Sequence, residues 1–226
     1  MANNNYNTRI VTGEVRFSYV NLLKPRENQF GGESKYSVTL LIPKSDTTTK
    51  QKIDTAIQAA IEKGKNGSWN GAVPPTLATP VHDGDGVRQD GTPYGEECKG
   101  HWVMTATSGL DYPPKVVDAG LNPILDATQV YSGMYGRIAL NFSPYVFAGK
   151  KGVGCYISTN VQKTRDGEPF GASAPAAEDD FGDFQQPQQA ANPWAGTPFN
   201  NAQQQQAQQA PIDPITGQPI GGVYGG

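Results

Sequence analysis

Strict alternation of apolar and polar residues in two early segments limits the possible folds of this chain more than any other property. In residues 13–20, Val15, Phe17 and Tyr19 alternate with Arg16 and Ser18, and residues 35–43 repeat the pattern with Tyr, Val, Leu and Ile. Successive side chains of a strand point to opposite faces, so this period indicates half-buried strands. The same reasoning predicts strands in residues 100–108, 137–147 and 152–163, and a short one in 115–118.

One helix interrupts the strands. Ile53, Ile57 and Ile61 recur every four residues, which predicts an amphipathic helix from Thr47 to Lys63. Ser45 and Asp46 are suited to cap its start, and Gly64 is suited to follow its end.

Strands that mostly lack intervening helices cannot form a doubly wound parallel sheet. A closed barrel removes exposed sheet edges, and an OB-type barrel fits the number of strands. We therefore predict a mainly β fold, an OB-type antiparallel β-barrel with one inserted α-helix and a disordered C-terminal tail. Periodicity alone leaves a β-sandwich open.

The composition changes sharply near residue 171. All 18 Lys and Arg residues lie at or before Arg165, whereas residues 171–226 contain five acids, no base and long Gln-rich runs. Such a segment buries too little apolar surface to offset the entropy lost on folding. We predict a folded, OB-type domain in residues 1–170 and a disordered tail, first acidic and then Gln/Pro/Gly-rich, in residues 171–226.

Evidence for catalysis is weak. Asp83, Asp85 and Asp90 could bind Mg²⁺ or Ca²⁺, but they miss the EF-hand spacing, and Asp-Gly steps are typical of tight turns. No P-loop or nucleophile-elbow motif is present. Cys98 and Cys155 have no metal-ligand spacing and indicate a reducing compartment. We expect no enzymatic activity, no cofactor, no metal and no membrane segment.

Basic and aromatic residues mix in the loops and strand ends of the first domain. Cations that follow phosphates and flat rings on which bases stack are what a single strand requires. Phe17, Tyr19, Trp102 and Phe142 have apolar neighbours in register, so we assign them to the core. For Tyr112, Tyr145 and Phe147, core and exposed positions fit equally well. The candidate DNA-binding residues are Lys24, Arg26, Phe30, Lys35, Arg88, Tyr112, Lys115, Tyr145, Phe147, Lys150, Lys151, Lys163 and Arg165.

An acidic cluster with two phenylalanines follows in the tail. It could imitate DNA phosphates and fold back on a basic groove, dock on a partner, or serve only as a solubilising linker. Its residues are Glu178, Asp179, Asp180, Phe181, Asp183 and Phe184.

The order of these motifs resembles a family of phage single-stranded-DNA-binding proteins. The resemblance runs through GEVRFSYVNLLKP, KYSVTLLIPKSD, DGDG, GHWVMTATS, PPKVVD, VYSGMYGRIALNF and QKTRDGEPFG to EDDF, nearly all of residues 8–184. It implies an OB fold, sequence-tolerant binding of single-stranded DNA, a role in phage replication, recombination or repair, and a location in the cytoplasm of the bacterial host. It also implies contacts of the acidic tail with phage or host replication proteins. Here, however, 42 residues follow the acidic cluster and the last residues are uncharged.

Two other functions remain open at this point. One is a Mg²⁺-dependent nuclease that uses the three aspartates, and the other is an interaction or virion protein that acts through its tail. The sequence is compatible with a monomer and with a homodimer.

Overall fold

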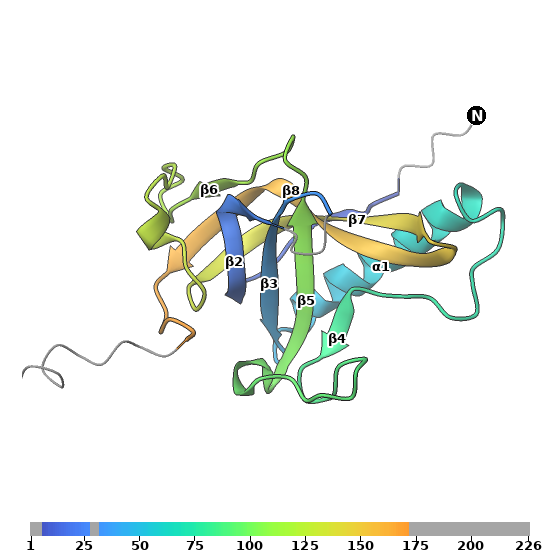
Figure 1. Ribbon diagram of the computed structural model, residues 1–226, viewed down its shortest axis with the longest axis horizontal. Coiled ribbons are helices and arrows are strands. Elements are labelled where there is room, and N and C mark those ends of the chain that lie inside the picture. Colours follow the sequence, from blue (N-terminus) through green and yellow to red (C-terminus); the bar gives the residue numbers. More distant parts are fainter. Residues whose placement is uncertain (1–5, 28–31, 172–226) are drawn as a thin grey trace, which may run out of the picture. The chain divides into compact units, whose positions relative to one another are not determined.

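The structure is a computed structural model that describes residues 6–27 and 32–171 (Figure 1). Within these residues the chain forms one α-helix, α1 (Thr47–Asn66), and two short 3₁₀ turns, Glu96–Cys98 and Ala127–Gln129. The strands are β1 (Arg9–Val11), β2 (Val15–Arg26), β3 (Lys35–Pro43), β4 (Val81–Asp83), β5 (His101–Ser108), β6 (Lys115–Val117), β7 (Tyr135–Phe147) and β8 (Lys150–Arg165). All predicted strands are present. In the described residues, no helix is both long and apolar enough to span a bilayer.

Five strands close into a barrel in the order β2-β3-β5-β8-β7 and back to β2. The pairs β2–β3, β3–β5, β7–β8 and β2–β7 are antiparallel, whereas β5 meets β8 in parallel at Thr107 and Tyr156. Figure 1 shows β2, β3 and β5 side by side, and the β7–β8 hairpin running past α1. A closed barrel of five strands is the OB architecture, so the predicted fold class is confirmed. The pairing is antiparallel throughout except at β8, which runs parallel to β5 and to β6.

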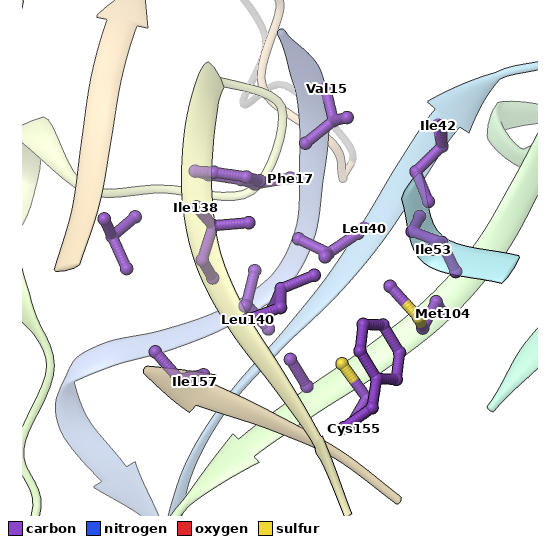
Figure 2. Close-up of a cluster of buried hydrophobic side chains, with 14 of the residues drawn as sticks. Val15, Phe17, Leu40, Ile42, Ile53, Met104, Ile138, Leu140, Cys155 and Ile157 are labelled. Atoms are coloured by element: carbon purple, nitrogen blue, oxygen red, sulfur yellow. The ribbon is translucent and has the colours of Figure 1, made fainter. Parts of the chain in front are cut away.

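The core fills the inside of this barrel. Phe17, Leu40 and Met104 are fully buried, and they meet Ile138 and Leu140 of β7 (Figure 2). Phe142 is also fully buried, so the core assignment of Phe17 and Phe142 is confirmed. The inward side chains are the apolar members of each period-two pattern, which is why the pattern predicts the barrel interior.

Helix α1 packs its isoleucine stripe against the same core. Ile53 and Ile57 are buried, and Figure 2 shows Ile53 beside Ile42 and Met104. Asp46 caps the helix by accepting a hydrogen bond from the Thr49 N–H at 2.9 Å, as predicted.

The end of α1 differs from the prediction. The helix continues to Asn66 and its C-cap is Gly67, so Gly64 lies inside the helix. A Cβ at Gly64 would lie 2.7 Å from the Trp69 indole and 2.8 Å from Pro144 Cβ. Gly64 therefore makes room for a fully buried tryptophan, a role that the local sequence does not reveal.

Two strands were not predicted from the sequence. β1 pairs with β7, and β4 pairs with β5. Each strand has only three residues, so it carries little pattern of its own, and pairing with a longer strand fixes its place.

Candidate nucleic-acid interface

The outward side chains of β2, β3 and β5 form a polar surface, which we call the outer sheet face. It consists of Asn21, Ser37, Thr39, Thr105 and Thr107. The Asn21 Nδ2 atom donates to Ser37 Oγ at 3.3 Å, and the Thr39 and Thr105 hydroxyls are 3.0 Å apart. These residues alternate with buried ones, so they share one side of the sheet. Small hydroxyl and amide side chains leave room for a polymer to lie across the strands.

Three exposed cations lie where β2 ends and β3 begins. Lys24 and Arg26 are on β2, and Arg26 is directly opposite Lys35 of β3. Within the described part of the chain, none of the three forms an ion pair. Like charges opposite each other destabilise a sheet, so a bound anion would be favourable here.

The β7–β8 hairpin continues this surface with aromatic residues. Tyr156 lies beside Thr107 in register, so its ring is on the same side as the outer sheet face. Tyr145 and the 77% exposed Phe147 follow on β7, and Lys150 is directly opposite Phe147. Burial, and then the nearby Tyr145 phenol, raise the pKa of Tyr156.

Tyr19 and Tyr112 are exposed, and sequence reasoning placed Tyr19 wrongly. Tyr19 was assigned to the core, but 62% of it is exposed. Its φ of 47° coincides with a register shift of β2 between Ser18 and Asn21, which turns the side chain outward. A register shift of this kind, a β-bulge, cannot be recognised from the alternation of apolar and polar residues in the sequence. Tyr112 is 74% exposed in the loop after β5, where its carbonyl accepts a hydrogen bond from the Ser108 hydroxyl.

Trp102 is also not a pure core residue. Its indole is half-buried at the edge of the core, and the Nζ atoms of Lys44 and Lys50 lie 4.9 and 4.8 Å from its ring centroid. Both ammonium groups are attracted by the ring, which explains why an aromatic residue tolerates this partly wet position.

Beyond the outer sheet face, towards the end of β3 and the start of β5, the outward side of the sheet is covered by other residues. Leu41 and Val103 form a small apolar cluster with Cys98, and Tyr94 and Phe170 pack over it. The Arg16 guanidinium lies 4.1 Å from the Phe170 ring centroid and holds the segment by donating to the Glu168 carbonyl at 2.7 Å. The open part of the face is therefore the end that carries Ser37 and Thr107.

Several candidate cations make internal contacts instead. Lys163 is only 12% exposed and lies 2.7 Å from an Asp166 carboxylate oxygen. Arg165 pairs with Glu14 at 2.9 Å and stacks on Tyr135. Their DNA-binding role remains a prediction, but their charges are already partly neutralised.

The remaining candidates are distributed over three places. Arg88 donates to the Pro93 carbonyl in the loop after β4, and Lys151 donates to the Trp69 carbonyl at 3.0 Å. Lys115 is exposed at the start of β6. Phe30 and the tail residues Glu178, Asp179, Asp180, Phe181, Asp183 and Phe184 lie outside the described residues.

The aspartates proposed as a metal site have a different partner. Lys44 Nζ lies 2.5 Å from Asp83 and 2.6 Å from Asp85, and these hydrogen bonds lower the pKa of both carboxyl groups. Asp90 instead accepts hydrogen bonds from Thr92. In residues 6–27 and 32–171, no three His, Cys, Asp or Glu side chains are grouped so as to hold a metal ion.

The geometry defines a class of protein. OB barrels bind oligonucleotides on the face of their second and third strands and with the loops between strands 1 and 2 and between strands 4 and 5. In this barrel those are the face of β3 and β5, the cationic β2–β3 end and the β7–β8 hairpin. The open polar face, the cations Lys24, Arg26 and Lys35, and the rings of Tyr145, Phe147 and Tyr156 lie at these three places. The fold and site are therefore those of an OB-type oligonucleotide-binding protein.

The chain belongs to the family described as Enterobacter phage Enc34, ssDNA-binding protein, whose model matches residues 8–191. The family predicted from the sequence is thus confirmed. The chain is similar to the single-stranded DNA-binding protein from bacteriophage Enc34 in complex with ssDNA, at 30% identity and a TM-score of 0.62 over 73% of this chain and 90% of that one. A second structure of that protein matches at 28% identity and a TM-score of 0.59, over 77% and 90% of the two chains. No curated protein sequence matches the chain.

Proposed function

We propose that this chain binds single-stranded DNA across the outer sheet face, with little sequence preference, in phage DNA replication, recombination or repair in the cytoplasm of the bacterial host. Lys24, Arg26 and Lys35 neutralise phosphates at one end of the path. Tyr156, Tyr145 and Phe147 contact bases along the hairpin.

One observation carries this proposal: exposed rings, and cations that form no ion pair among the described residues, flank the polar face that OB barrels use for oligonucleotides. In a duplex the bases stack on each other and are not available to protein rings, whereas unpaired bases can stack on Tyr and Phe. Ser37, Thr39 and Thr107 of the outer sheet face have side chains too short to reach base edges deep in the groove of a duplex. The arrangement therefore favours an unpaired strand and tolerates different sequences.

A titration of the full chain tests the proposal. Labelled oligo-dT is followed by fluorescence anisotropy at two salt concentrations, with a mixed-sequence single strand and its duplex as competitors. We expect saturable binding that weakens as salt rises, effective competition by the single strand and poor competition by the duplex. Absence of saturable binding, or stronger competition by the duplex, would contradict the proposal.

We further propose that the chain does not cleave the DNA it binds. Asp83 and Asp85 share the Lys44 ammonium, which neutralises the charge that a Mg²⁺ ion would need. Incubating end-labelled single strands with the full chain and Mg²⁺ should leave them intact. Cleavage that disappears in an Asp83→Asn variant would support the nuclease instead.

The acidic cluster Glu178–Phe184 is the part of the sequence best suited to protein partners. We propose that it recruits phage or host replication proteins and competes with DNA for the cationic end of the interface. Replacing Asp179, Asp180 and Asp183 by Asn in the full chain should tighten DNA binding at low salt and less so at high salt. Unchanged affinity at both salt concentrations would rule out the competition.

A further inference from the structure

Two glycines near the start of β8 are not explained by backbone conformation. Gly152 and Gly154 pair with Tyr145 and Ser143 of β7, and neither has a positive φ. Any residue can adopt their conformation, and glycine weakens the interior of a strand. What matters at these positions is therefore the missing side chain.

The space above both glycines is occupied by tyrosine rings. A Cβ at Gly152 would lie 2.6 Å from the Tyr145 hydroxyl oxygen and 2.7 Å from its Cζ. A Cβ at Gly154 would lie 2.8 Å from the Tyr156 hydroxyl oxygen and 2.9 Å from its Cε2. Tyr145 thus crosses from β7 onto its neighbour, and Tyr156 lies back along its own strand.

The two rings lie on the same side of the hairpin, next to the outer sheet face. Residues 152, 154 and 156 alternate with the buried Val153 and Cys155, so they point outward. Each ring has one side against the strand, and Tyr156 retains 39% exposure. A ring held in this way offers its other side to a base.

The backbone beneath the rings is held on both edges. β7 pairs with β8 in unbroken register from Phe142 to Phe147, and the Val153 N–H donates to the Ala78 carbonyl at 2.9 Å on the far edge. The backbone under the two tyrosine rings is therefore rigid before any ligand binds, and a rigid site loses less entropy on binding.

At Gly64 and Gly136, by contrast, the ring that crowds the glycine belongs to the core. A Cβ at Gly136 would meet the Phe17 ring at 2.8 Å, but Phe17 is fully buried. Covering a strand glycine with an aromatic ring can also simply stabilise a sheet. At Gly152 and Gly154 the covering rings border the polar face instead of filling the interior, so their position matters to a ligand.

From this geometry we propose, building on the proposed function, that Gly152 and Gly154 are positioning residues that hold Tyr145 and Tyr156 flat as stacking platforms for two bases of a single strand. A methyl group at either position lifts the ring from the strand and tilts its free side. Because the displaced atoms are the ends of side chains, the barrel itself remains folded.

The test uses Gly154→Ala and Gly152→Ala in the full chain, with oligo-dT as the probe. Stacking on an aromatic side chain corresponds to about a five- to 150-fold change in affinity, so we expect a loss in that range for Gly154→Ala, with an unchanged dependence on salt. Gly109→Ala is the matched control, because it lies beside the interface and a Cβ there meets nothing within 4 Å.

A double-mutant cycle separates ring positioning from structural damage. If Gly154 acts through the ring, adding Gly154→Ala to Tyr156→Leu causes no further loss of affinity. Additive losses, or a Gly154→Ala variant that binds like wild type, would overturn the inference. Failure of the wild-type chain to bind oligo-dT would instead refute the proposed function.

Discussion

Removing the opposed cations of the β2–β3 end should change how DNA binding depends on salt. Arg26 and Lys35 are Cα partners on one face, are exposed, and have no ion-pair partner among the described residues. If each neutralises one phosphate, the double variant Arg26→Gln/Lys35→Gln loses two such contacts. Because the two like charges repel each other, the melting temperature of this variant should not fall.

The magnitude follows from counterion release. For a single strand, each neutralised phosphate adds about 0.7 to the slope of log affinity against log salt, so two contacts add about 1.4. Between about 50 and 200 mM salt, wild type should therefore lose about sevenfold more affinity than the double variant.

Fluorescence anisotropy with labelled oligo-dT at four or more salt concentrations measures this slope. The matched control is Lys52→Gln/Lys63→Gln, which removes the same net charge from exposed positions of α1. Its slope should stay close to that of wild type. Equal slopes for the two double variants would show that net charge, not phosphate contact at the β2–β3 end, governs binding.

Three further predictions address the rings, the helix and the acid range. Tyr112→Ala and Phe147→Ala should each weaken oligo-dT binding by ~1–3 kcal/mol with the salt slope unchanged, and an altered slope would argue against stacking. Gly64→Ala should lower the free energy of unfolding in urea by ~1–2 kcal/mol despite the higher helix propensity of Ala, because its Cβ meets the buried Trp69 ring; a more stable variant would contradict this packing. Hydrogen bonds from Thr164 and Arg165 lower the pKa of Glu14 below its usual 4.5, so its contribution to stability is present above that value and is lost as pH falls through the lowered pKa. Between pH 6 and pH 3, the melting temperature should therefore fall less for Glu14→Gln than for wild type. Equal falls in the two proteins would refute this role of Glu14.

The predictable parts of the site were those with local causes. Lys24, Arg26 and Lys35 could be singled out because charged residues beside strand ends are exposed in most folds. Phe147 could be singled out because it stands next to a turn with two lysines. Lys163 could not be distinguished from them, because it is held by the Gln129 carbonyl and the Tyr131 ring, more than thirty residues away in the sequence.

Some misplacements arose from contacts between distant segments. Tyr19 follows the apolar alternation of β2, but the register shift after Ser18 turns it into solvent. Gly64 looks like a residue that ends a helix, but it is the position where Trp69 packs on α1. The register shift has no cause within a few residues of sequence, and the Trp69 indole is held against Gly64 by the distant Pro144 and by its hydrogen bond to the Tyr145 carbonyl.

The sequence by itself determined every strand except β1 and β4, the inserted helix, the apolar interior and the change in composition near residue 171. These depend on periodicity and composition, which act over short stretches of chain. Only the tertiary structure decided that β8 lies beside β5. This pairing places Tyr156 and the β7–β8 hairpin next to Ser37 and Thr107. The physical reason is that barrel closure brings together strands about fifty residues apart, and the pairing of their edges is set by the whole barrel and not by either strand alone.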